Sequence, residues 1–199
     1  MPTITERRRD AVKQGIYEAA VEVLTRDGLD GATMDRVAAE AGICKGSLYN
    51  YFKDKTHILE FVFDKTIEPL NESIDQIVDS KDCAVAKLRA VFREILEYLG
   101  PRRKLFSFLM GQQPTQQLMT PRRSTGPPTL AQLIHQGIQQ GVFRKCDPLF
   151  HATLIYGGMQ AVADNYVNLG ESKTIDESVE LITDFFVSGI LASPQNAGK

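Results

Sequence analysis

The residues best suited to chemistry in this chain lie close together, between positions 45 and 55. The side chains with a cation or a hydroxyl group that suits phosphate oxygens are Lys45, Ser47, Tyr49, Tyr51 and Lys55. Among them, Asn50 offers an amide that suits a base edge, and Gly46 would let a backbone come close to a duplex. The set predicts contact with DNA.

The sequence offers no set of residues for catalysis, a metal or a cofactor. The histidines and cysteines are scattered, without the spacing of a zinc or redox motif: His57, His135, His151, Cys44, Cys83 and Cys146. Neither a glycine-rich phosphate loop nor a G-x-S-x-G elbow is present. We therefore expect no enzyme activity, no cofactor and no metal site.

The formal net charge is −2, and the sequence contains no long apolar run. A general nucleic-acid coat would be basic, whereas a specific DNA reader can confine its cations to one end. Residues 1–9 carry no apolar segment, and no stretch reaches a transmembrane length. Together with the scattered cysteines, these features predict a cytoplasmic protein.

Two short helices joined by a tight turn must position the chemical residues. Thr33 is a suitable N-cap for the first helix, and Gly42 accepts the positive φ of the turn. Leu48 and Phe52 form the inward pair of the second helix. This pattern predicts a helix-turn-helix, which places its second helix in the major groove. On pattern alone, an ordinary corner between two helices stays open.

The ordered string T-x-x-x-V-A-x-x-A-G-I-x-K-G-S-L-Y-x-Y-F-x-x-K-x-x-I-L begins at Thr33. It closely resembles the DNA-binding region of the TetR family of bacterial transcriptional repressors. The resemblance implies DNA contact by Thr33, Lys45, Gly46, Ser47, Tyr49, Tyr51 and Lys55. Two positions depart from the pattern: Cys44 stands where a capping serine is frequent, and Asn50 occupies a position that varies in the family.

The rest of the chain has helical periodicity, which predicts an all-α fold of about nine helices. A polar arm, Pro2–Arg9, is either a frayed terminus or reaches DNA, and a first helix ending at Gly28 completes a three-helix head. A long helix beginning near residue 54 contains Pro69, which predicts a break, a fixed kink or a pivot. We place a DNA-binding domain at 1–53 and a ligand-binding and dimerisation domain at 54–199.

In the C-terminal domain, a long loop is expected at 111–129, with Thr129 capping the helix that follows. Thr174 and Glu177 have the spacing of a capping box for the last helix. The helix after Pro148 is apolar on two sides, and a second copy of the chain is the natural cover for one of them.

The TetR resemblance likewise implies a homodimer that joins the last two helices of each copy in a four-helix interface. The expected interface residues are Leu154, Gly157, Gly158, Ala161, Val179, Ile182, Phe186 and Ile190. The resemblance also implies a small-molecule pocket whose occupation releases DNA. Its candidate lining residues are Phe92, Phe106, Met110, Ile134, His135, Tyr156, Met159, Gln160 and Tyr166. For each of them a role in a dry packed core stays open.

These expectations describe a homodimeric repressor that binds a palindromic double-stranded DNA operator and is released by a small, mostly apolar effector. Two alternatives stay open. An activator, or a regulator controlled by a partner protein, would have the same head. A helical enzyme or binding module could contain the corner by coincidence. The sequence identifies neither the operator, the effector, the regulated genes nor the sign of the control.

Overall fold

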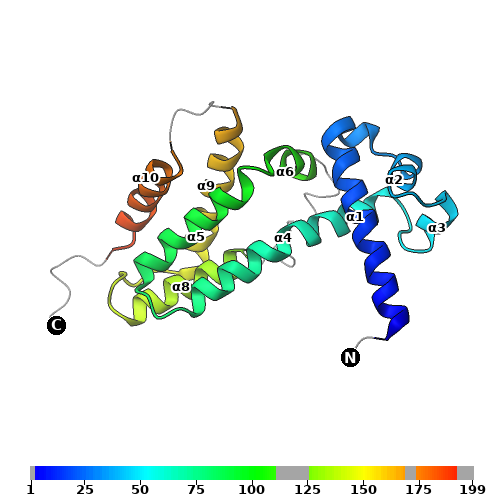
Figure 1. Ribbon diagram of the computed structural model, residues 1–199. Coiled ribbons are helices and arrows are strands. Elements are labelled where there is room, and N and C mark those ends of the chain that lie inside the picture. The colour runs from blue at the N-terminus through cyan, green and yellow to red at the C-terminus, as the bar shows by residue number, and fades with distance from the viewer. Residues whose placement is uncertain (1–2, 111–125, 169–173, 192–199) are drawn as a thin grey trace. The chain divides into compact units, whose positions relative to one another are not determined.

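The computed structural model of the chain describes residues 3–110, 126–168 and 174–191. Within these residues the fold is all-α, as predicted, with nine helices and no strand (Figure 1). No helix among the described residues is long and apolar enough to cross a membrane.

The chain divides into two compact units. We call the unit formed by residues 1–68 and 104–118 the head, and the unit formed by residues 69–103 and 119–199 the body. The division falls inside a helix, after Glu68, whereas the sequence places the functional boundary at residue 53. That functional boundary stays a prediction.

The first helix of the head, α1 (Ile4–Gly31), begins with a capping box. The Glu6 backbone N–H donates to the Thr3 hydroxyl at 3.2 Å, and the Glu6 carboxylate accepts from the Thr3 backbone N–H at 2.7 Å. Residues 4–9 are therefore helical, and the prediction of a polar arm there is wrong. Gly28, with φ of 70° and ψ of −174°, leaves the helical conformation, so the regular helix is interrupted at the residue where the sequence predicts its end, and a short helical turn up to Gly31 follows the kink.

The core of the head is built by α1, α2 (Met34–Glu40), α3 (Lys45–Tyr49) and the first turns of α4 (Lys55–Asp79). Its buried apolar side chains include Ile16, Ala20, Val23, Leu24, Val37, Ala38, Leu48, Phe52, Ile58, Leu59 and Val62. Four helices thus share one apolar centre, which is how helices too short to be stable alone are held in place.

Ion pairs tie α1 to α2 on the surface of the head. Arg26 Nη1 lies 3.0 Å from Glu40 Oε2, and Arg36 Nη1 lies 3.0 Å from Asp27 Oδ2. Both contacts join the C-terminal part of α1 to α2 and add to the apolar packing between these two helices.

The helix α4 runs without a break through Pro69. The expected alternative of two separate helices is therefore excluded, and whether Pro69 acts as a pivot stays a prediction. The short helix α6 (Arg103–Met110) contributes residues 104–110 to the head, where the Phe108 ring lies against Gly28.

The body contains α5 (Ala84–Leu99), α8 (Gly126–Gln139), α9 (Pro148–Asn168) and α10 (Ile175–Ser188). Helix α8 packs on α9, and α5 packs on both α10 and α8 (Figure 1). The buried residues of the body include Leu88, Val91, Phe92, Leu130, Leu133, Ile134, Ala152, Ile155 and Val179.

Two helix starts in the body test the sequence predictions. The capping box of Thr174 and Glu177 is confirmed. The predicted Thr129 cap is wrong, because α8 already begins at Gly126 and takes both following prolines into its first turn. A proline is tolerated there since the first backbone N–H groups of a helix have no partner within it. Of the predicted loop, residues 111–125 lie outside the described residues.

Candidate nucleic-acid interface

The turn between α2 and α3 has the geometry of a closed helix-turn-helix. Gly42 has φ of 67° and donates its N–H to the Ala39 carbonyl, and the Ile43 N–H donates to the Ala38 carbonyl. These bonds satisfy carbonyl groups at the end of α2 and reverse the chain within a few residues. Thr33 caps α2 as expected, since its hydroxyl accepts from the Arg36 N–H.

The helix α3 presents almost all of its surface to solvent. Only Leu48 of its five residues is buried, and Phe52, just beyond it, is 2% exposed. Lys45, Gly46 and Tyr49 are exposed, Ser47 is half-buried, and Tyr49 leaves 48% of its surface accessible. A helix so short and so open needs the fold behind it for stability, and its free face is available to a ligand as large as a duplex.

Asn50 and Tyr51 follow α3 directly. Asn50 is exposed and forms the C-cap, whereas Tyr51 is half-buried. The structure thus brings the predicted DNA-binding residues from 45 to 51 onto one corner of the head.

Lys45 already has a partner in the chain. Its ammonium lies 2.7 Å from Asp35 Oδ1 of α2, and both side chains are more than half exposed. The Asp35 carboxylate raises the pKa of Lys45 above its ordinary value by hydrogen bonding and by charge. A phosphate that binds Lys45 must compete with this carboxylate.

Cys44 occupies the N-cap of α3 but makes no capping bond to the helix. Its Sγ lies 3.1 Å from Ser47 Oγ, and this hydrogen bond is the main reason why the pKa of the exposed thiol is lowered. The side chain of Ser47 therefore faces the start of α3.

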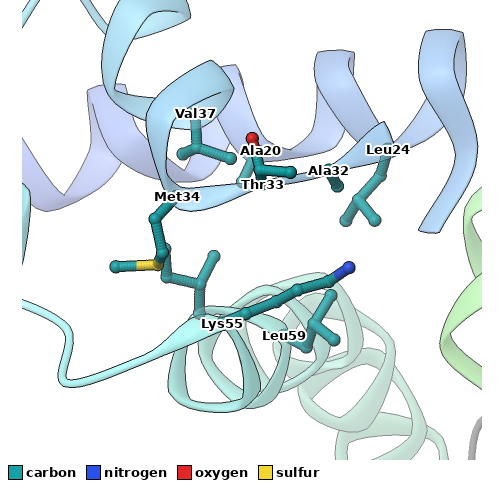
Figure 2. A pocket seen from close by; sticks show the side chains of 9 residues that line it. Ala20, Leu24, Ala32, Thr33, Met34, Val37, Lys55 and Leu59 are labelled. Atoms are coloured by element: carbon teal, nitrogen blue, oxygen red, sulfur yellow. The ribbon is translucent and has the colours of Figure 1, made fainter. Parts of the chain in front are cut away.

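Lys55 is engaged inside the head. Its ammonium donates a hydrogen bond to the backbone carbonyl of Leu29, near the end of α1. Figure 2 shows the side chain lying along α4 and reaching toward Leu24 and Ala32. It lines an otherwise mostly apolar pocket formed by Ala20, Leu24, Ala32, Thr33, Met34, Val37, Lys55, Ile58 and Leu59. In this state Lys55 ties α4 to α1, and its contact with DNA stays a prediction.

The residues predicted to line an effector pocket differ in burial, and their role in a pocket stays a prediction. Phe92, Ile134 and Met159 are buried in the body, and Tyr156 is half-buried against Gly126. Phe106 is buried but belongs to the head.

His135, proposed as a polar anchor of the pocket, is exposed on α8 and lies 2.9 Å from the Gln139 amide. It faces away from the core because the buried positions of α8 fall on its other side. The side chains of Met110, Gln160 and Tyr166 lie outside the described residues.

The residues predicted for the dimer interface fall into two groups. Leu154, Gly157 and Ala161 of α9 are exposed, in keeping with a surface open to a second copy. Val179, Ile182 and Ile190 are buried within one chain, and Phe186 lies over Gly158 at the contact between α9 and α10. Val179, Ile182 and Ile190 therefore pack inside the body, whereas Gly158 and Phe186 are half-buried.

The residues of α10 that do face solvent are Leu181 and Phe185, exposed by 54% and 76%. The sequence contains both stripes of α10, and periodicity alone did not distinguish the inner from the outer one. Phe150 on α9 is 60% exposed as well.

Known proteins resemble the chain in sequence and in fold. Residues 16–62 match the model of a family described as bacterial regulatory proteins, tetR family. An HTH-type transcriptional repressor of Streptomyces coelicolor is 34% identical over 103 residues, which are 46% of this chain and 54% of that protein. The uncharacterized HTH-type transcriptional regulator YhgD of Bacillus subtilis is 25% identical over 141 residues, covering 68% and 74%.

Solved structures extend the likeness beyond the head. The transcriptional regulator FadR from Bacillus subtilis, in complex with stearoyl-CoA, matches with a TM-score of 0.78 at 23% identity. The match covers 89% of this chain and 98% of that chain. At this identity the likeness concerns the fold, and it includes the helices of the body.

Proposed function

The chain belongs to the TetR family of bacterial regulatory proteins, and from that premise we propose that it is a cytoplasmic repressor that binds a palindromic operator as a homodimer. In this proposal a small, mostly apolar effector binds the body and releases the DNA. The observation that supports DNA binding most directly is the exposed face of α3, with Lys45, Gly46 and Tyr49 open to solvent above the buried Leu48.

The contacts with DNA divide by chemistry. Lys45, Ser47, Tyr49 and Tyr51 would bind phosphates, and Asn50 would face a base edge. Thr33 and Gly46 would meet the backbone of the duplex at close range. Lys55 would bind DNA only after its hydrogen bond to the Leu29 carbonyl breaks.

The homodimer is supported by the exposed apolar surface of α9 and α10. Phe150, Leu154, Leu181 and Phe185 are each more than half exposed, which is unusual for a group of large apolar side chains in a monomer. We assign the interface to these residues in place of the buried stripe of α10. A two-fold axis there would present two copies of α3 to a palindrome.

The proposed effector is a long-chain acyl compound or another greasy ligand. It is supported by the apolar and aromatic residues of the body and by the stearoyl-CoA bound to the FadR structure of similar fold. An effector that binds better to a dimer unable to span the operator would lower DNA affinity by that difference in binding free energy.

The test of DNA binding uses the full-length chain and selection from random duplex DNA, followed by fluorescence anisotropy at two salt concentrations. We expect an enriched palindrome, bound more tightly than scrambled DNA, with an affinity that falls as salt rises. Lys45→Ala and Tyr49→Ala should lose this affinity while keeping the wild-type melting temperature, because both side chains are exposed. If selection enriches no sequence, the proposed function is wrong.

The effector is tested separately, by thermal unfolding and by release of the selected operator. Stearoyl-CoA should raise the melting temperature and dissociate the complex, whereas coenzyme A without the acyl chain should do neither. Equal effects of the two compounds would contradict an apolar effector.

A further inference from the structure

The first turns of α1 carry three consecutive arginines that the helix-turn-helix does not use. Arg7, Arg8 and Arg9 are all exposed. Within the described residues, no ion pair or hydrogen bond of their side chains is present. Because α1 begins at Ile4, these arginines lie on a formed helix.

The capping box fixes this helix without the arginines. The Glu6 carboxylate accepts from both the backbone N–H and the hydroxyl of Thr3, at 2.7 and 3.0 Å. The one carboxylate in the first turn is thus occupied by its own helix end, although Asp10 follows the arginines on the next turn. Consecutive helical residues lie about 100° apart, so the three guanidinium groups spread over more than half of the circumference.

The side of α1 that carries Arg9 leads to the DNA-binding corner. Arg9, Lys13 and Tyr17 are four residues apart in turn and share one face of the helix. Lys13 Nζ lies 5.7 Å from the centre of the Phe61 ring, and the Tyr17 ring meets the same ring edge-on at 6.4 Å. Arg9 is therefore one turn beyond the contact between α1 and α4.

The Phe61 ring connects this face to the end of the helix-turn-helix. Its centre lies 5.0 Å from the centre of the Phe52 ring, and Phe52 stands between Tyr51 and the exposed Lys53. In Figure 1 the first turns of α1 extend past the other helices of the head. A cationic extension thus begins beside the corner that carries the residues proposed to bind DNA.

We propose that Arg7, Arg8 and Arg9 form a second DNA contact, in which the start of α1 binds phosphates flanking the groove that α3 enters. The partner is the phosphate backbone, because guanidinium groups on a rigid helix suit phosphate oxygens. The contact adds affinity and salt dependence without sequence preference. It rests on the proposed function, since it needs a DNA duplex at α3.

The test compares the salt dependence of binding for the wild type and the triple variant Arg7→Gln, Arg8→Gln, Arg9→Gln in the full-length chain. Glutamine keeps nearly the helix propensity of arginine, so the circular dichroism spectrum and the melting temperature should not change. The slope of log K against log salt should become shallower by about 0.9 for each arginine that binds a phosphate. Affinity for the selected operator and for scrambled DNA should fall by the same factor.

Two matched variants separate this contact from net charge and from packing. Replacing the three arginines by lysines keeps the charge and should keep most of the slope. Replacing Lys81, Arg89 and Lys145 of the body by glutamine removes the same charge elsewhere and should leave the slope unchanged.

The possible failures are distinct. An unchanged slope in the glutamine triple variant, with a wild type that selects an operator, overturns the second contact alone. An equal loss in the body variant also overturns it, because net charge would then explain the effect. A changed preference for the operator over scrambled DNA would show base reading and overturn a contact with phosphates alone. A wild type that selects no sequence overturns the proposed function and this contact together.

Discussion

A single methyl group at Gly46 should separate DNA binding from folding. Gly46 lies in the exposed helix α3, and a Cβ atom built on it would meet nothing within 4 Å. Alanine is favoured over glycine in a helix, so Gly46→Ala should raise the free energy of unfolding by about 0.5–1 kcal/mol. The same methyl group stands where the backbone of α3 is proposed to approach the duplex.

We expect Gly46→Ala to weaken operator binding by about tenfold, the equivalent of roughly one hydrogen bond to a charged phosphate, about 1.4 kcal/mol. Urea unfolding gives the stability, and fluorescence anisotropy with the selected operator gives the affinity. The two effects have opposite directions, because the variant should gain stability and lose operator affinity.

Two other glycines with equally open surroundings serve as controls. Gly15 lies within α1, and Gly15→Ala should stabilise the chain without changing operator affinity. Gly42 has φ of 67°, which an alanine adopts only with strain, so Gly42→Ala should destabilise it by about 1 kcal/mol. Wild-type operator affinity in Gly46→Ala would refute the close approach of α3. A loss of stability in Gly46→Ala would contradict the open surroundings that the structure gives to this residue.

Three further predictions follow from other contacts. Tyr17→Phe removes the hydroxyl that lies 3.2 Å from Oγ1 of the buried Thr66, and urea unfolding should show a loss of about 1 kcal/mol; an unchanged midpoint would mean that this bond contributes nothing. The pKa of the Cys44 thiol is lowered, mainly by a hydrogen bond, and that of Cys146 is raised, mainly by burial, so the thiolate of Cys44 forms first as pH rises. Iodoacetamide labelling followed by mass spectrometry should therefore modify Cys44 from a lower pH than Cys146, and the reverse order would contradict these causes. Phe185→Glu should convert the proposed homodimer to a monomer in sedimentation velocity, and a variant that stays dimeric would show that the interface lies elsewhere.

The elements that the sequence predicted well are those specified by neighbouring residues. The turn of the helix-turn-helix depends on Gly42 and on apolar residues a few positions away, so its pattern is readable. The start of α10 is equally local, because Thr174 and Glu177 form its capping box by themselves. Thr3 and Glu6 have the same spacing and the same bonds, but the arginines that follow them were read as a polar arm.

The features that the sequence did not predict depend on contacts between distant segments. Lys55 bonds to the carbonyl of Leu29, a group that every residue possesses and that no side-chain pattern reveals. The choice between the stripes of α10 likewise depends on α5 and α9, since both stripes are apolar and only packing decides which is buried. Hydrophobic periodicity locates a helix face, but it does not name the neighbour that covers it.

The different partners of the two lysines indicate how the head exchanges its own contacts for those of DNA. The pair between Lys45 and Asp35 is exposed on both sides, and such pairs contribute little because water screens them. Lys45 can therefore turn to a phosphate with little loss, while Asp35 then disfavours any duplex that brings another phosphate close. Lys55 is part-buried and donates to the Leu29 carbonyl, which also accepts the Ala32 N–H, so moving Lys55 to a phosphate would cost the hydrogen bond that ties α4 to α1. Charge contacts with DNA should accordingly depend on Lys45 and the arginines of α1 more than on Lys55.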